Sequence, residues 1–291
     1  MVGTPATPCT VSRASAHAEP RRNDTVEREQ YDLMFAQEER HWWYVGMRRI
    51  SAALLDGYPP RTDARGPLSI LDAGCGSGGM TRFLRRWGGV TGVDLAPEAL
   101  GLARMRGLAR LARASVGALP FLPASFDVVT SFDVLYHLNV SDDLAALREL
   151  HRVLRPGGVL LIRLPAYDWI RGAHDDAVHT RHRYTRAELS AKLEDVGFRL
   201  EHATYANSIL FPLAPVKRYL EHRNGTQEAT DLWRPPAPVN RLLADLLGLE
   251  AAVARSVGLP WGLSVFGVAR RVHPVESVAL QPARQTVEVT V

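Results

Sequence analysis

The most specific chemical pattern in this chain is the segment ILDAGCGSGG, residues 70–79. An apolar run leads into four glycines, and a helix-forming stretch follows them. Glycine permits a tight turn and lets a ligand approach the backbone N–H groups closely. Asp94 follows after about 20 residues, at the end of the next apolar run, where an acid can bind two ribose hydroxyls. We therefore expect a nucleotide-containing cofactor; a tight turn without a ligand is the alternative.

A second concentration of reactive side chains lies in the segment AYDWIRGAHDDAVHTRHRYT, residues 166–185. Histidine is suited to proton transfer near neutral pH, so we expect His174, Asp175 and His179 to form the catalytic base. Their spacing also resembles a metal-ligand set, but two histidines and one acid in a loop are weak support, and we expect no metal. A structural loop whose polar side chains cap the following helix is the open alternative.

The rest of the chain alternates between strand-like and helix-like patterns. Apolar runs typical of buried strands lie at residues 68–74, 90–95, 126–132, 157–165 and 263–271. Helical patterns lie at residues 26–55, with a break near Gly46, at 141–154, and at 185–197, where Thr185 and Glu188 form a capping box. This alternation predicts an α/β fold, a mostly parallel sheet with helices on both faces. Such sheets bind ligands beyond the carboxyl ends of their strands.

Composition narrows the class of protein. Among 291 residues, 46% are hydrophobic and 23% charged, as in ordinary globular proteins. The net charge of +4 comes without a dense basic run, so we expect no nucleic-acid partner. Cys9 and Cys75 form no disulfide framework, which favours a reducing cytoplasm, and no apolar stretch is long enough for a transmembrane helix. We expect disordered tails at 1–24 and 274–291 around a domain at 25–273.

The order and spacing of four blocks make the interpretation more specific. The blocks LDAGCGSG, GVDL, LPFLPASFDVVTSFDVLYHL and LRELHRVLRPGGVLLI resemble the class I S-adenosylmethionine-dependent methyltransferases over residues 40–200. The segments HWWY, HDDAVHTRHRYT and LPWGLSVFGVARR resemble a bacterial small-molecule or glycan-type subgroup of them. The resemblance implies a Rossmann-like seven-stranded sheet whose last strand is antiparallel, and S-adenosyl-L-methionine as the cofactor.

The resemblance also implies roles for single residues. Asp72 and the backbone of the glycine turn would hold the methionine part, Asp94 the ribose, and Leu95 the adenine. Ser115 stands where many family members have an acid that meets the adenine amine, so this contact loses a charge. The complete implied set of cofactor-binding residues is Asp72, Gly74, Gly76, Gly78, Asp94, Leu95, Ser115, Val116, Phe132 and Asp133.

In this fold, the segment before the first strand commonly lies over the cofactor as a lid. Here it reads HWWYVGMRRI, residues 41–50. Large aromatic side chains are unfavourable in water, so we expect one tryptophan to pack inward and the other to face the cofactor with His41 or Tyr44. Packing of both tryptophans in the core is the open alternative. Arg48 and Arg49 are expected to bind the cofactor carboxylate or an anionic acceptor. The residues expected to contact the acceptor are Trp43, Tyr44, Tyr136, His137, Arg183 and Tyr184.

Residues 205–258 exceed a minimal domain of this kind and contain two apolar helical patterns. We expect a small helical cap over the acceptor, with a dimer surface or a membrane-facing patch as alternatives. The predicted function is methyl transfer to an oxygen or nitrogen of a small-molecule or glycan- or lipid-linked acceptor, with a homodimer as one possible state. A non-catalytic cofactor-binding scaffold and an NAD-dependent oxidoreductase are the alternatives.

Overall fold

A computed structural model describes residues 31–63, 65–172, 175, 179–215, 223 and 235–272. Both predicted tails and His174 lie outside these residues. The strands are β1 (Leu68–Ala73), β2 (Gly88–Asp94), β3 (Leu111–Arg113), β4 (Phe126–Phe132), β5 (Leu154–Pro165), β6 (Phe198–Ala206) and β7 (Ser264–Arg271).

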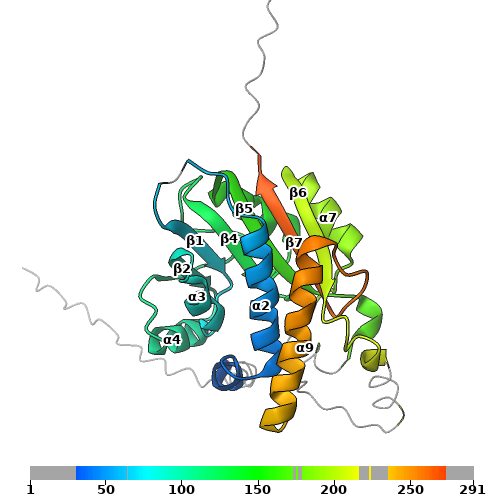
Figure 1. The fold of residues 1–291 in the computed structure, drawn as a ribbon. Helices are drawn as coiled ribbons and strands as arrows, with labels where there is room; N and C mark the ends of the chain where they lie inside the picture. Colours follow the sequence, from blue (N-terminus) through cyan, green and yellow to red (C-terminus); the bar gives the residue numbers. More distant parts are fainter. Residues whose placement is uncertain are drawn as a thin grey trace, which may run out of the picture.

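All these strands form one seven-stranded sheet in the order β3-β2-β1-β4-β5-β7-β6 (Figure 1). Strands β1 to β5 pair in parallel, and β7 inserts antiparallel between β5 and β6. Every residue of β4 is buried, as expected for a central strand covered on both faces. The predicted Rossmann-like sheet with an antiparallel last strand is confirmed.

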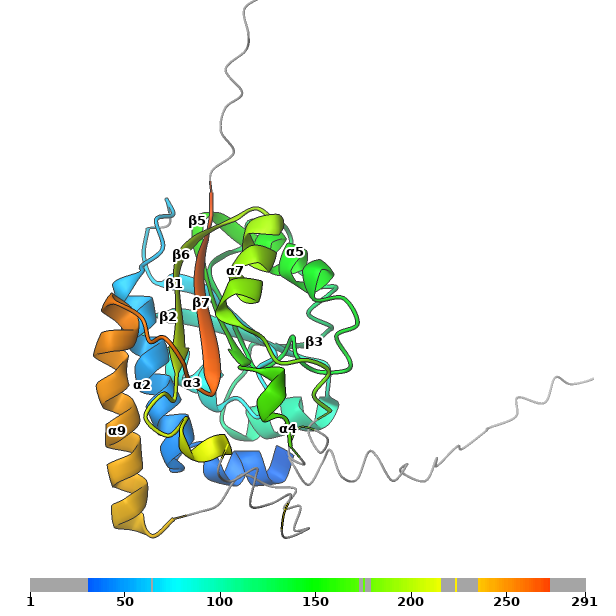
Figure 2. The same cartoon turned by 90° about the vertical axis from the view of Figure 1, so that its right-hand side faces the viewer.

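Helices cover both faces of the sheet, as Figure 2 shows for the sheet seen near its edge. The helices are α2 (Trp42–Gly57), α3 (Gly79–Leu84), α4 (Pro97–Met105), α5 (Asp143–Val153), α7 (Arg186–Asp195) and α9 (Ala237–Ser256), with a 3-10 turn at Asp168–Ile170. Helices α2 and α9 bury Ile50, Leu54 and Leu247 against one face, whereas α5 and α7 bury Leu150 and Leu193 against the other. None of the described helices has the length and apolarity needed to cross a membrane.

Helix α9 lies beside α2 rather than alone over the strand ends (Figure 1). The two helices approach closely at Gly46, where an added Cβ would lie 2.4 Å from Leu247 Cβ. The expected helix break at Gly46 is therefore wrong: this glycine makes room for α9 while α2 continues through it. Residues 216–222 and 224–234, the middle of the expected cap, lie outside the described residues, so the cap stays a prediction.

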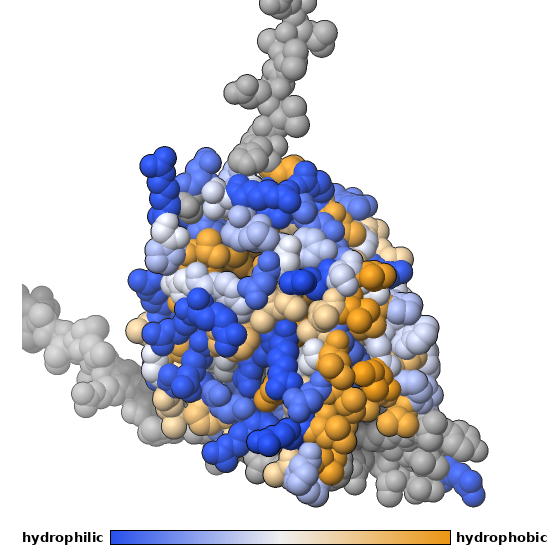
Figure 3. Space-filling view, in the orientation of Figure 1, coloured by the Kyte–Doolittle hydropathy of each residue, from blue (hydrophilic) through white to orange (hydrophobic). Residues whose placement is uncertain are grey.

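The outer surface of α9 carries an apolar stripe. Leu242, Leu249 and Val253 are 59%, 70% and 45% exposed, and Leu246 between them is half-buried. Figure 3 shows this hydrophobic area along α9, with hydrophilic side chains over the neighbouring α2 and α3. An exposed apolar stripe of this kind is required by both alternatives named for residues 205–258, a dimer surface and a membrane-facing patch.

Candidate cofactor and acceptor site

The glycine turn joins the end of β1 to the start of α3. Gly74 has φ 84°, and an added Cβ there would lie 2.1 Å from Val134 Cγ2, so both conformation and space require glycine. Gly78 has φ 85° and is the N-cap of α3. The turn therefore brings backbone N–H groups to the carboxyl end of the central strands, where this class of sheet binds ligands.

Asp94 ends β2 and faces this turn. Its Oδ2 accepts a hydrogen bond from Gly76 N at 2.8 Å, and its Oδ1 accepts one from Ala96 N at 3.0 Å. Burial raises the pKa of the Asp94 carboxyl above its ordinary value, against these hydrogen bonds. A carboxylate has about four lone-pair positions, so Asp94 retains capacity for further donors such as ribose hydroxyls. The neighbouring Leu95 is 46% exposed, an apolar surface next to that carboxylate.

Asp72 lies deeper, with 1% of its surface exposed. Its Oδ2 accepts from Thr81 Oγ1 at 2.6 Å, and its Oδ1 accepts from Thr130 Oγ1 at 2.8 Å. Burial raises the pKa of Asp72 to about 6. These contacts tie β1 to α3 and β4, so Asp72 supports the glycine turn from below, and its contact with the methionine part stays a prediction.

The chain before α2 docks on the glycine turn through Glu38, a residue that the sequence analysis missed. Glu38 Oε2 accepts hydrogen bonds from Gly79 N at 3.1 Å and from Ser77 Oγ at 2.5 Å. It also pairs with Arg106 Nη2 at 3.0 Å. A carboxylate at the N-terminus of a helix is favourable, since the first N–H groups have no partners within the helix. This contact holds the chain just before the expected lid segment against the glycine turn.

The two tryptophans of the lid segment make different contacts, and which of them faces the cofactor stays a prediction. Trp42 N donates to Asn240 Oδ1 of α9 at 2.9 Å, which places Trp42 at the α2–α9 contact. The Trp43 ring lies against the guanidinium of Arg163, 4.8 Å from ring centroid to Cζ, and packs edge-on against Tyr44. Arg49 instead turns to α9 and pairs with Asp245 at 2.8 Å, so its geometry does not favour the expected cofactor contact.

The remaining residues expected to bind the cofactor lie at neighbouring strand ends. Ser115 Oγ accepts a hydrogen bond from Gly117 N at 3.2 Å, just after β3. Val116 and Phe132 are 6% and 9% exposed. Their positions are compatible with the adenine and sulfonium contacts that the resemblance implies, and these contacts stay predictions.

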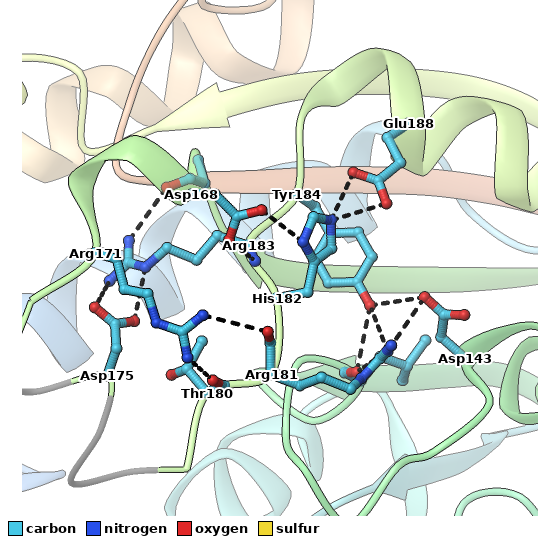
Figure 4. Close-up of polar contacts among 12 residues, drawn as sticks. Asp143, Asp168, Arg171, Asp175, Thr180, Arg181, His182, Arg183, Tyr184 and Glu188 are labelled. Atoms are coloured by element: carbon cyan, nitrogen blue, oxygen red, sulfur yellow. Dashed lines mark hydrogen bonds and ion pairs between the residues drawn. The ribbon is translucent and has the colours of Figure 1, made fainter.

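The loop at 166–185 is held by a buried ion pair (Figure 4). Arg183 Nε and Nη2 donate to the two oxygens of Asp175 at 2.7 and 3.1 Å, and Arg183 Nη1 donates to Ala166 O. Burial alone would raise the pKa of Asp175, but the hydrogen bond and charge of Arg183 outweigh it and lower the pKa. This geometry fits a structural role for Asp175 and Arg183 rather than the base and acceptor contact that we expected.

Tyr184 and His182 bind the same loop to its surroundings (Figure 4). Tyr184 is 1% exposed, and its hydroxyl donates to Asp143 Oδ2 at 2.9 Å, so this predicted acceptor contact faces the core. His182 lies between Asp168, 2.6 Å from Nδ1, and Glu188, 2.9 Å from Nε2. Thr185 caps α7 as predicted, but Glu188 binds His182 instead of completing the capping box.

Two other histidines come together at the edge of the site. The rings of His137 and His179 lie 5.8 Å apart, and Leu138 N donates to His179 O at 2.9 Å. Burial raises the pKa of Asp94, and the charge of His137 partly offsets this rise, which places His137 near the Asp94 carboxylate. His179 as a base therefore stays a prediction, with His137 as its neighbour. The described residues contain no group of three metal-ligating side chains.

Asp133, immediately after β4, completes the site. Its Oδ2 accepts from Arg163 Nε at 2.9 Å and from Arg163 Nη2 at 2.5 Å. Arg163 was not among the expected site residues, although an arginine within the apolar run VLLIRLP of β5 indicates a buried charge that needs a partner. Half-buried Tyr44 and Tyr136 lie near Asp133, whose charge contributes to raising the pKa of both phenols.

The donor and acceptor groups at this end of the sheet fit S-adenosylmethionine. Asp94 has remaining acceptor capacity for ribose hydroxyls, exposed Leu95 offers an apolar contact for adenine, and the glycines of the turn carry no side chains of their own. An acid held beside backbone N–H groups of a strand–helix turn is the arrangement that nucleotide cofactors require. The fit of S-adenosylmethionine to this site therefore rests on the geometry of the glycine turn and Asp94.

Comparisons with known proteins agree. A methyltransferase domain model matches residues 71–162. The chain is 36% identical over 172 residues to malonyl-(acyl-carrier protein) O-methyltransferase of Enterobacter lignolyticus, covering 56% of this chain and 65% of that relative, slightly under two thirds. It is 32% identical over 196 residues to ubiquinone biosynthesis O-methyltransferase of Xanthomonas oryzae pv. oryzae, covering 57% and 79%.

Solved structures agree on the fold. The S-adenosylmethionine-dependent methyltransferase of Mesorhizobium loti superposes with a TM-score of 0.50 at 21% identity, covering 77% of this chain and 98% of that one. A chain from the complex of the Haloferax volcanii Trm112 methyltransferase activator with a methyltransferase gives 0.53 at 20% identity, covering 86% and 97%. Together with the sequence relatives, these likenesses show that the chain belongs to the class I S-adenosylmethionine-dependent methyltransferases.

Proposed function

We propose that this protein transfers the methyl group of S-adenosylmethionine to an oxygen or nitrogen atom of a small-molecule or glycan- or lipid-linked acceptor. The observation that carries the proposal is Asp94, which holds Gly76 N of the glycine turn at 2.8 Å and retains acceptor capacity for ribose hydroxyls. The family supports methyl transfer over the oxidoreductase alternative. Both sequence relatives described above are named O-methyltransferases, which favours an oxygen acceptor.

When bound, S-adenosylmethionine supplies a methyl group that its sulfonium makes electrophilic. The protein's task is then to hold an acceptor atom in line with that methyl and to exclude water. Such positioning can lower a barrier by roughly 7–11 kcal/mol in well-oriented systems. We assign the ribose to Asp94, the adenine to Leu95, and the neighbourhood of the methyl to Phe132 and Asp133. An acceptor that keeps its proton at neutral pH needs a base, and His179 stays our proposal for it.

Calorimetry with S-adenosylhomocysteine, followed by a methyl-transfer assay with labelled S-adenosylmethionine and a metabolite extract of source cells lacking the gene, tests the proposal. We expect binding and labelled product. Binding of NAD(H) without binding of S-adenosylhomocysteine would favour an oxidoreductase. Binding of S-adenosylhomocysteine without any labelled product would favour the scaffold alternative.

We also propose that the chain forms a homodimer through α9 and acts in the cytoplasm. Leu242, Leu246, Leu249 and Val253 repeat at spacings of four, three and four residues, the pattern with which two helices pair. A substitution of Leu249 by Asp is expected to convert a dimer in light scattering into a monomer. A wild-type monomer would contradict the dimer, and a monomer that binds lipid vesicles would favour the membrane-facing alternative.

A further inference from the structure

Three polar side chains lie near one another beyond the end of β4. Asp133 follows β4 directly, Tyr136 lies three residues later, and Tyr44 comes from α2. All three are half-buried. Burial, and after it the charge of neighbouring acids including Asp133, raises the pKa of both phenols, so both hydroxyls stay protonated. Among the described residues, neither phenol hydroxyl has a hydrogen-bond partner.

Arg163 fixes Asp133 from below. Both of its hydrogen bonds go to Oδ2, which leaves Oδ1 without a partner among the described residues. Arg163 is 8% exposed, and its guanidinium carbon Cζ lies 4.8 Å from the Trp43 ring centroid and 5.2 Å from that of Phe132. Arginine between aromatic faces is favourable and holds its planar group in one orientation.

The backbone of Asp133 is also held in an uncommon conformation. Its φ is 55°, a region that residues other than glycine rarely adopt, and its N–H donates to Arg163 O at 2.9 Å. Strained backbone of this kind persists where the surroundings fix it, commonly at functional sites. Two parts of Arg163 thus determine where the free Oδ1 of Asp133 lies.

We propose that Asp133 Oδ1 accepts the hydrogen bond of a hydroxyl group on the acceptor, so that the acceptor is a hydroxyl compound rather than a carboxylate. This inference rests on the proposed function. Arg163 is then a positioning residue, and the phenols of Tyr44 and Tyr136 donate to other oxygens of the acceptor. The acceptor oxygen forms the new C–O bond, and the electron pair of the broken C–S bond stays on sulfur. The hydroxyl proton passes to Asp133, which in this inference takes the role of base in place of His179, and from Asp133 to solvent.

The charges around the cluster disfavour a carboxylate acceptor. Arg163 already holds Asp133, and Arg183, the cation that faces Tyr136, already holds Asp175. Arg48, the other cation near Tyr44, donates to Glu39 O and lies over Phe83 of α3, toward the glycine turn. A carboxylate next to Asp133 would therefore meet a like charge, and like charges at short distance disfavour each other's ionised form.

The chemistry of the labelled product tests the acceptor class. The wild-type protein is incubated with tritiated S-adenosylmethionine and the metabolite extract, and the product is treated with alkali and, separately, with hydriodic acid. A methyl ether survives alkali and releases methyl iodide in acid, which is the expected result. Label released as methanol by alkali indicates an ester, and label resistant to both indicates an N-methyl group; either overturns this inference while methyl transfer stands. Absence of label overturns the proposed function and this inference with it.

Variants then test the residues with the isolated acceptor. Asp133→Asn is expected to lower kcat/KM about 100-fold, the scale of a lost proton acceptor, with S-adenosylhomocysteine affinity within threefold of wild type. Arg163→Met is expected to lower kcat more than it raises KM, with partial rescue by Arg163→Lys. Asp245→Asn on α9 is the control. Unchanged kcat/KM in Asp133→Asn overturns the inference; if that variant does not fold, unchanged kcat/KM in Tyr136→Phe does so.

Discussion

The glycine turn and the loop at 166–185 both attract attention by residue type, but the structure uses them differently. In the turn, Asp94 holds two backbone N–H groups and keeps acceptor capacity. In the loop, Arg183 holds Asp175, and His182 lies between two carboxylates. Reactive side chains that satisfy each other stabilise a loop, whereas a site needs atoms whose hydrogen bonds remain to be made. By that criterion Asp133 Oδ1 is a stronger candidate for chemistry than Asp175.

The largest expected effect is on the loop. Asp175→Ala leaves the buried Arg183 guanidinium without its carboxylate, and breaking a buried pair in this way typically costs about 3–5 kcal/mol. Urea unfolding measures the loss. The double variant Asp175→Leu with Arg183→Met removes both charges and is expected to recover most of it. A loss below about 1 kcal/mol together with abolished methyl transfer would restore Asp175 as the base.

At the glycine turn, a substitution of Asp94 is expected to weaken cofactor binding. Asp94→Ala removes a carboxylate whose hydrogen bonds to ribose hydroxyls are each worth roughly 1.5–3 kcal/mol, so S-adenosylhomocysteine affinity is expected to fall about 100-fold or more. Calorimetry measures the affinity, with Asp245→Ala as the control at an exposed acid. An affinity within threefold of wild type would refute the ribose assignment and remove the contrast between the two regions.

The sequence predicted what local patterns determine. Strand runs alternating with helices gave the sheet, and the spacing between the glycines and Asp94 gave the turn, because the chain brings both to adjacent strand ends. The pairing of Asp175 with Arg183 depends on how the loop folds back, which no local pattern encodes. Helix α9 has the same apolar periodicity whether it covers an acceptor or packs on α2. The role of Arg163 could not be predicted either, because it depends on β5 lying beside the end of β4, which Asp133 follows.

A smaller expected effect is the contribution of the buried acids Asp72 and Asp127 to stability, which depends on pH in opposite directions. The pKa of Asp72 is raised by burial to about 6. The native state therefore binds this proton more tightly than the unfolded state, and the stabilisation is lost as pH rises from about 4 through about 6, by roughly 2–3 kcal/mol. The free energy of unfolding of wild type minus that of Asp72→Asn is expected to fall over this range. A flat difference would contradict the raised pKa.

Asp127, at the other end of β4, is expected to show the opposite pH dependence of stability. Burial alone would raise its pKa, but hydrogen bonds from Thr62, Ser69 N and Arg155 outweigh it and lower the pKa. Its stabilisation is therefore present above the unfolded pKa and lost as pH falls through the lower native pKa. The free energy of unfolding is measured as a function of pH for wild type and for Asp127→Asn. The difference, wild type minus variant, is expected to become smaller as the pH falls.

The smallest expected effect lies outside both regions and tests the remaining sequence prediction for Arg49. Its pair with Asp245 has side chains 46% and 56% exposed, and exposed pairs contribute about 0–1 kcal/mol. Arg49→Ala is therefore expected to change the free energy of unfolding by less than about 1 kcal/mol. Because Arg49 points to α9 and away from the glycine turn, S-adenosylhomocysteine affinity should stay unchanged. A tenfold loss of that affinity would instead show that Arg49 leaves Asp245 to bind the cofactor carboxylate, as its place after HWWY first indicated.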